Sequence, residues 1–213
     1  NQYGVKQSSE FAIKSEINSN QSNPSIVALN NGKFIISYES THESGTHPSV
    51  YAQIFDGSAN KVGNEFRINS ATKNDQTDVQ IALLKDGGFV SVFVSNLADG
   101  DAKGIYAQQF TSSGAKVGSE FRVNSITALN QQKPDVVGLD NGGFFVAWDS
   151  EKPGHGHPSD VYGQFYNHLG VAIGSNFRIN KTVNDVIDHI SVAKLNNGNI
   201  VASWYSSGGG SNV

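Results

Sequence analysis

Apolar residues recur along this chain in short runs, each bounded by Gly, Asn, Asp or Ser. Runs this short, with turn residues on both sides, are typical of β-strands rather than of helices. The run that begins at Phe144 reads "FFVAWDS", and similar phrases begin at Phe34, Phe89 and Ile200. The sequence therefore predicts an all-β protein that is built from one repeated unit.

The repeated unit has a period of 55 or 56 residues. Phe34, Phe89, Phe144 and Ile200 are separated by 55, 55 and 56 positions. A second phrase, written "EFAIK", "EFRIN", "EFRVN" and "NFRIN", has the same spacing, with its Phe at positions 11, 66, 121 and 177. A third phrase occurs three times, as "VYAQIF", "IYAQQF" and "VYGQFY". Because repeats of this length are typical of solenoids and propellers, the repeat decides the fold.

Each period predicts four short strands. The first strand is followed by Asn-Gly or Asp-Gly, with a Gly at positions 32, 87, 142 and 198, and this is a strong hairpin signal. The second strand is the phrase that opens the period, the third contains "YAQ" and the fourth contains "EFRVN". The first strands are expected at Ser25–Leu29, Gln80–Leu84, Asp135–Leu139 and Ser191–Leu195.

The second strand of each period is apolar on both faces. In the third copy, Phe144, Val146 and Trp148 point to one face, whereas Phe145 points to the other. A strand with one wet face would alternate apolar and polar residues, so each sheet is expected to pack between two neighbours. Four small sheets that pack in this way predict a four-bladed β-propeller with four antiparallel strands in each blade.

The two chain ends predict how the ring closes. The fourth copy stops at Val213 after its second strand, whereas Tyr3–Val5 and Glu10–Ile13 have the patterns of a third and a fourth strand. We therefore expect one domain over residues 1–213 whose last blade is closed by the N- and C-terminal strands, which would leave no open sheet edge. The alternative is a piece cut from a longer array. The expected blades cover about 23–70, 78–125, 133–180, and 189–213 together with 1–14.

The phrases "VGSEFRVN", "LDNGGFFVAW" and "VYAQ" resemble tandem repeats in large secreted or surface proteins of bacteria and some microbial eukaryotes. In those repeats the segment between the Trp strand and "YAQ" is usually an acidic, Gly-rich loop. The resemblance covers nearly the whole chain and implies a propeller-like repeat, but it implies no activity. Likeness at the level of a fold cannot supply a function.

Composition and charge narrow the class of partner. The chain has no Cys and no Met, and 15 basic against 19 acidic residues give a formal net charge of −4. The charges are interspersed and form no basic stripe, so nucleic acid is not an expected partner. No apolar run reaches the roughly 18 residues of a membrane helix, so membrane insertion is not expected. The low charge and the lack of oxidisable sulfur favour an extracellular or cell-surface location.

The loops between the second and third strands differ from copy to copy and should all emerge on one rim of the disc. Variable loops on a rigid repeat are the usual place for binding. Aromatic rings and small polar groups beside several His residues suit a polar ligand such as a sugar. The candidate ligand-binding residues are His42, His47, Ser49, Trp148, Asp149, His155, His157, Asp160 and Tyr205.

Polar residues that recur in every copy are assigned to structure instead. Gln53, Gln108 and Gln164 occupy the same place in the "YAQ" phrase. Because buried polar groups need partners, we expect these side chains to satisfy hydrogen bonds between blades.

These observations favour a non-enzymatic extracellular binding module, lectin-like or adhesin-like, that recognises a glycan or another polar cell-surface ligand. The alternative is a structural or assembly unit of a larger surface protein or filament, with oligomers that form through sheet edges. The sequence contains no phosphate loop, nucleophile elbow or HExxH motif, and Asp149 with Glu151 reads as a solvated acid pair. An enzyme is therefore not expected.

A calcium ion is the cofactor for which the sequence offers candidate ligands. Asn96, Asp99 and Asp101 place oxygen atoms in one loop, and backbone carbonyls would have to complete the six or more oxygens of such a site. The phrases "HESGTH" and "HGH" offer imidazoles for zinc or copper, but neither provides the three or four ligands that a closed site needs.

If an ion at Asp99 and Asp101 or at the His loops supports folding, EDTA should lower the melting temperature. Added calcium or zinc should then restore it, because a ligand that binds only the folded state stabilises that state by mass action. Thermal melts followed by circular dichroism test this. A melting temperature that EDTA leaves unchanged would exclude a structural ion.

Overall fold

The computed structural model describes residues 9–13, 19–41, 46–96, 102–153, 158–181 and 186–207. Three sheets contain four antiparallel strands each, in the orders β1-β2-β3-β4, β5-β6-β7-β8 and β9-β10-β11-β12, and a fourth sheet pairs β13 with β14. No helix in the described ranges is long and apolar enough to cross a membrane. The strands are β1 Gln21–Ala28, β2 Phe34–Ser40, β3 Ser49–Phe55, β4 Lys61–Arg67, β5 Gln76–Leu83, β6 Phe89–Asn96, β7 Lys103–Phe110, β8 Lys116–Arg122, β9 Gln131–Gly138, β10 Phe144–Glu151, β11 Ser159–Tyr166, β12 Ala172–Arg178, β13 Ile187–Lys194 and β14 Ile200–Ser206.

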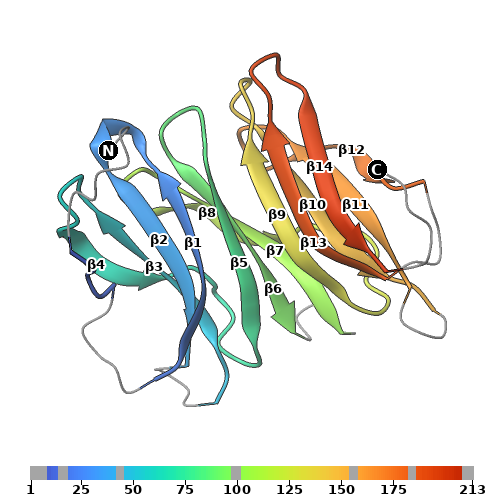
Figure 1. Ribbon diagram of the computed structural model, residues 1–213, viewed down its shortest axis with the longest axis horizontal. Coiled ribbons are helices and arrows are strands. Elements are labelled where there is room, and N and C mark those ends of the chain that lie inside the picture. The colour runs from blue at the N-terminus through green and yellow to red at the C-terminus, as the bar shows by residue number, and fades with distance from the viewer. Residues whose placement is uncertain are drawn as a thin grey trace.

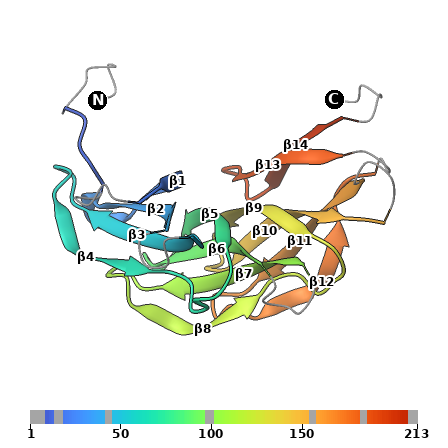
Figure 2. The same ribbon diagram turned by 90° about the horizontal axis from the view of Figure 1, so that it is seen from below.

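The four sheets stand side by side as the blades of a propeller (Figure 1). Strands β1, β5, β9 and β13 are the inner strands and contact one another in sequence around the axis, while β4, β8 and β12 are outermost. Figure 2 shows the blades as an arc that runs from β1–β4 at one end to β13–β14 at the other. The prediction of an all-β, four-bladed propeller is confirmed.

The structure describes only part of the N-terminal segment that is predicted to complete blade 4. Tyr3–Val5 is outside the described residues, and Glu10–Ile13 forms no strand. Phe11 instead packs against blade 1, with ring centroids 5.5 Å from Phe55 and 6.5 Å from Phe34. Phe11 thus contacts blade 1 without belonging to a strand, and the completion of blade 4 by residues 1–14 stays a prediction.

The turns between the first and second strands are as predicted. Gly32, Gly87, Gly142 and Gly198 have φ values of 70°, 86°, 89° and 84°. Residues with a side chain rarely adopt this left-handed conformation, so the turn requires Gly at this position. The turn fixes the register of each inner strand on the strand that follows it.

The inner strands begin four residues earlier than predicted. Strand β1 starts at Gln21 rather than Ser25, and β13 starts at Ile187 rather than Ser191. Each of these early segments has polar residues at its centre, Ser22 and Asn23 or Asp188 and His189, and contains a β-bulge. A bulge breaks the alternation of side chains on which the prediction of strands rests, so the sequence pattern identified only the part beyond it.

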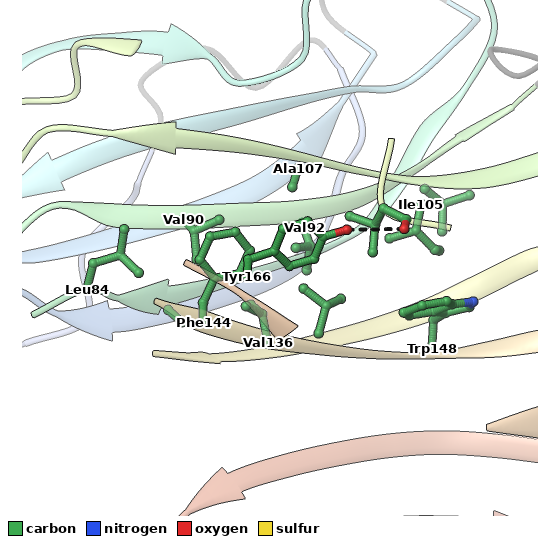
Figure 3. Close-up of a cluster of buried hydrophobic side chains, with 13 residues drawn as sticks. Leu84, Val90, Val92, Ile105, Ala107, Val136, Phe144, Trp148 and Tyr166 are labelled. Atoms are coloured by element: carbon green, nitrogen blue, oxygen red, sulfur yellow. Dashed lines mark hydrogen bonds between the residues drawn. The ribbon is translucent and has the colours of Figure 1, made fainter. Parts of the chain in front are cut away.

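Both faces of the second strands β2, β6 and β10 are buried, as expected, whereas no residue of β14 is fully buried. Between blades 2 and 3, Phe144, Val146 and Trp148 pack against Val90 and Val92, and each of these five side chains is at most 2% exposed. Figure 3 shows this cluster, with Tyr166 reaching across it to donate a hydrogen bond of 3.1 Å to the carbonyl of Val123. Blade 2 is held to blade 3 by this contact.

The recurring Gln residues are buried as predicted, but they act within a blade. The Gln53 Nε2 donates to the carbonyls of Ile54, Val62 and Gly63, which belong to β3 and β4 of the same blade. Gln108 and Gln164 make the matching bonds in blades 2 and 3. Each Gln therefore satisfies carbonyls where the register of the outer strand shifts.

Replacing Phe144 with Ala should lower the free energy of unfolding by about 3–5 kcal/mol, because the ring is fully buried between two blades. The Phe11→Ala variant should cost roughly 1–2 kcal/mol, since Phe11 is 45% exposed. Urea denaturation measures both. Equal losses for the two variants would contradict the described packing.

Candidate active site at the propeller axis

The rim that carries the loops between second and third strands also carries a β-bulge at the start of every inner strand. The residue in the bulge is left-handed in all four blades: φ is 48° at Asn23, 53° at Asp78, 53° at Lys133 and 52° at His189. This conformation is uncommon for residues with side chains, and such strain gathers at functional sites. The four bulges are therefore the first candidates for chemistry.

The four bulges surround a cavity of about 480 Å³. All four inner strands contribute to its wall, so the cavity lies on the propeller axis. We call it the axial pocket and define it by Asn23, Asp78, Gln80, Lys133, Asp188 and His189.

An ion pair bridges blades 3 and 4 at the axial pocket. The Nζ of Lys133 lies 2.5 Å from Oδ1 of Asp188, and both side chains are about one-third exposed, at 36% and 31%. The Nδ1 of His189 lies 3.1 Å from the same oxygen. The hydrogen bond from Lys133 is the main cause of a lowered pKa at Asp188, so this carboxyl group stays ionised.

A second carboxyl group lies behind this pair. Asp149, on β10, is only 3% exposed and lines a side pocket of about 150 Å³, in whose wall Lys133 also takes part. Burial raises the pKa of Asp149 above its ordinary value, and hydrogen bonds from Ser159 and Gln132 offset only part of that effect. The charge of Asp188 raises this pKa further, which places the two carboxyl groups within electrostatic reach of each other.

Blade 1 provides an internal reference for Asp149. Glu39 pairs with Val50 as Asp149 pairs with Val161, so both acids occupy the same register. The Glu39 carboxylate accepts hydrogen bonds from the Ser22 hydroxyl, the Asn23 amide and the backbone N–H of Asp78. Its role is to hold two bulges in place.

Asp149 is one methylene shorter than Glu39 and does not make the matching contacts. Its Oδ2 accepts a bond of 3.3 Å from Gln132, and no group among the described residues meets hydrogen-bond geometry at the buried Oδ1, although the Ser159 hydroxyl interacts closely enough with the carboxyl group to lower its pKa. A buried carboxyl oxygen without a partner is costly and rare in folded proteins. Asp149 therefore has an unused hydrogen-bond acceptor in the wall of the side pocket.

The structure distributes the other predicted ligand residues around the rim. His47 is exposed and its Nδ1 lies 2.7 Å from Oδ1 of Asp75, and Tyr205 is 60% exposed on β14. Trp148 was expected at the binding surface, but it is 2% exposed in the core between blades 2 and 3 and cannot offer its ring to a ligand. Of the predicted set, Asp149 lines the side pocket next to the axis.

Two further predicted residues are buried in structural contacts. Ser49 is 8% exposed, and its hydroxyl lies 3.5 Å from the amide of Asn69. Asp160 is buried and pairs with Lys152 at 3.0 Å and with Arg178 at 3.7 Å. These contacts stabilise the start of a third strand, β3 for Ser49 and β11 for Asp160.

The remaining predicted residues lie largely outside the described residues. These are His42, His155 and His157 of the ligand set, and Asp99 and Asp101 of the calcium set. Asn96 is described at the end of β6, where its backbone N–H donates to the carbonyl of Asp75. Within the described ranges no three His, Asp or Glu side chains gather as a metal site would require.

Sequence reasoning missed the axial pair Lys133 and Asp188. A usable signal was present at the strand starts "QSNPS", "QTDVQ", "QQKPD" and "IDHIS", where one position holds Asn, Asp, Lys or His while its surroundings repeat. A polar position that changes from copy to copy, inside an otherwise repeated strand, marks a site that the fold leaves free.

Comparison with known proteins supports the fold. No protein-family profile matches the sequence, and no curated protein matches it either. A protein of unknown function from Dyadobacter fermentans is similar in structure at a TM-score of 0.67 and 14% identity, over 90% of this chain and 64% of that one. This chain thus spans less than two thirds of that protein. The resemblance to surface-protein repeats is supported only as far as a propeller-like fold.

Two similar structures are carbohydrate-cleaving enzymes. The endo-arabinase of Bacteroides thetaiotaomicron has a TM-score of 0.58 at 18% identity, over 91% of this chain and 74% of the enzyme. An α-L-arabinofuranosidase from Lactobacillus brevis has a TM-score of 0.55 at 11% identity, over 87% and 65%.

These structures correct the interpretation from sequence. A non-enzymatic lectin-like module, with an assembly unit as the alternative, is contradicted, because the chain has a fold that occurs in glycoside hydrolases. Carboxyl groups brought together from separate blades leave no contiguous motif, so a search for sequence motifs does not test for a site of this kind.

The raised pKa of Asp149 predicts how stability depends on pH. A carboxyl group whose pKa is higher in the folded than in the unfolded chain stabilises the fold when the pH is below its pKa in the unfolded chain, about 4. This stabilisation is lost as the pH rises through the pKa of the group in the folded chain. The gain in melting temperature of Asp149→Asn over the wild type should therefore be small at pH 4 and grow toward pH 7.

The control for this comparison is Glu39→Gln in the same register. Its amide nitrogen would face groups that donate hydrogen bonds, so this variant should melt below the wild type at both pH values. A difference between Asp149→Asn and wild type that is independent of pH would contradict the raised pKa.

Proposed function

We propose that the axial pocket and the side pocket next to it, which share Lys133, together hydrolyse a glycosidic bond, and that the chain acts as a carbohydrate-active enzyme on a glycan. The observation that carries this proposal is the contrast between Asp149 and Asp188. Both carboxyl groups feel the charge of Lys133, yet burial raises the pKa of one and a hydrogen bond lowers the pKa of the other. Pairs of titratable groups whose environments separate their pKa values are typical of acid–base catalysis.

The two carboxyl groups suit the two roles in glycoside hydrolysis. Protonated Asp149 would donate its proton to the oxygen of the leaving sugar as the bond from that oxygen to the anomeric carbon breaks. Ionised Asp188 would stabilise the positive charge that develops on the sugar ring and would take a proton from the attacking water. Lys133 keeps Asp188 ionised and so acts as a positioning residue.

The surroundings of the pair support a sugar as ligand. The axial pocket offers an amide, a carboxylate and an imidazole on separate blades through Asn23, Asp78 and His189. Hydroxyl groups both donate and accept hydrogen bonds, so polar groups converging from several directions suit a sugar. A glycan ligand also agrees with the enzymes of similar fold, and an extracellular or cell-surface location remains part of the proposal.

Hydrolysis should be measured on a panel of aryl glycosides, with arabinofuranosides and linear arabinan first because of the similar structures. Asp149→Asn and Asp188→Asn should each lower kcat by about 10²–10⁴-fold, since each removes a proton donor or acceptor. The Asp149→Asn protein should remain folded, as its melting curve would show.

Asp140→Asn is the matched control. This carboxylate lies in the turn between β9 and β10, on the opposite rim, where it pairs with Lys194 at 2.7 Å and is 70% exposed. Its replacement should leave kcat unchanged. Full activity in Asp149→Asn, or no hydrolysis of any glycoside by the wild type, would refute the proposal.

A further inference from the structure

The two carboxyl groups of the proposed site are held by consecutive residues of β9. Gln132 donates a hydrogen bond of 3.3 Å to Oδ2 of Asp149. The next residue, Lys133, lies 2.5 Å from Oδ1 of Asp188. One short segment of an inner strand therefore contacts both carboxyl groups, although they belong to different blades.

Ser159 makes a second link between the two carboxyl groups. It is the first residue of β11, is 2% exposed, and lines the side pocket together with Asp149. Its Oγ accepts a hydrogen bond of 3.0 Å from the backbone N–H of Ile187, which directly precedes Asp188 in the chain. The Ser159 hydroxyl thus ties blade 3 to the strand start that carries Asp188.

The strand register brings the same hydroxyl to Asp149. Val161 pairs with Asp149, and Ser159 precedes Val161 by two residues, so Ser159 and Asp149 are diagonal neighbours on one face of the sheet. Because the N–H of Ile187 already binds the hydroxyl oxygen, the hydroxyl proton can point into the side pocket toward Asp149. Burial raises the pKa of Asp149, and the hydrogen bond from Ser159 opposes that effect.

The junction between blades 1 and 2 shows that the fold does not require a hydroxyl at this place. Gln76, at the start of β5, is the equivalent of Ile187, and its N–H donates a bond of 2.9 Å to the backbone carbonyl of Pro48. Pro48 holds the position of Ser159, three residues before the Tyr of the third strand. A side-chain bond therefore replaces a backbone bond at the junction that carries the two carboxyl groups.

We infer that Ser159 is a positioning residue, which fixes the separation of Asp149 and Asp188 and orients the Asp149 carboxyl group in the side pocket. Its effect on rate rests on the proposed function, whereas its contact with Asp149 does not. The charged or titratable groups that also face Asp149 are Lys133 on β9, Glu151 on β10 and Asp188 on β13. Variants of Ser159 retain all three groups.

The titration of Asp149 tests the contact without any substrate. It is followed by NMR of the isotope-labelled carboxyl carbon, whose signal is assigned by its loss in Asp149→Asn. Ser159→Ala should raise the pKa of Asp149, because the ionised form loses a hydrogen bond. Ser159→Thr keeps the hydroxyl and should titrate like the wild type. If the Ala variant does not fold, Ser159→Cys fills the same space with a weaker donor and should raise the pKa by a smaller amount.

Ser49→Ala is the matched control. Ser49 is also a buried hydroxyl at the first residue of a third strand, but it belongs to blade 1. Its replacement should leave the titration of Asp149 unchanged.

The pH profile of hydrolysis tests the positioning role, on the glycoside that the wild type cleaves best. Ser159→Ala should lower kcat by about 10–100-fold, because a proton donor that is misplaced by a small distance transfers its proton poorly. KM should stay within about twofold. The alkaline limb of the kcat profile should move to higher pH, since Asp149 would stay protonated longer. Ser159→Thr should restore both kcat and the profile.

Four results would overturn the inference. These are an unchanged titration of Asp149 in the Ala or Cys variant, an equal shift in Ser49→Ala, the same shift in Ser159→Thr, or a shifted titration with an unchanged kcat. If the wild type hydrolyses no glycoside, the proposed function fails, and the titration still decides whether Ser159 acts on Asp149.

Discussion

The structure depends on the need of the second strands of the first three blades, β2, β6 and β10, to bury both of their faces. Phe144, Val146 and Trp148 on one face of β10, and Phe145 and Ala147 on the other, are each at most 3% exposed. A single sheet can cover only one such face, so a sheet must lie on either side. Packing a row of twisted sheets face to face turns them about a common axis. The arc, the ring of inner strands and the axial pocket all follow from this requirement.

Much of the fold could be predicted from the sequence because its causes are local. The turn after each inner strand needs Gly at positive φ, and the short apolar runs fix where the second strands lie. The first half of each inner strand escaped prediction, because a bulge removes the period of two on which the inference rests. The contact of Phe11 with blade 1 could not be inferred either, since the same phrase fits every outer strand equally well.

The candidate site could be predicted only in part. Asp149 was recognisable as an acidic residue at the rim, but its burial and its free oxygen depend on how β10 is covered by neighbouring blades. Lys133 and Asp188 are 55 residues apart, and they meet because adjacent inner strands lie side by side, which brings Lys133 next to Asp188 and to its own equivalent, His189. Residues that are about one repeat apart in the sequence therefore come into direct contact on adjacent inner strands. Glu39 reaches the amide of Asn23 in the bulge, whereas Asp149, one methylene shorter, leaves its Oδ1 without a partner among the described residues.

At the bulge of each inner strand the backbone conformation is the same in all four blades, although the side chain differs. Asn23, Asp78, Lys133 and His189 share one conformation within 5° in φ, although their side chains have little in common. The neighbouring strands, rather than the residue itself, impose that conformation. Duplication of the repeat thus created four equivalent places around the axis at which substitution changes charge and hydrogen bonding while the scaffold stays the same. Such a fold can acquire a new specificity one blade at a time.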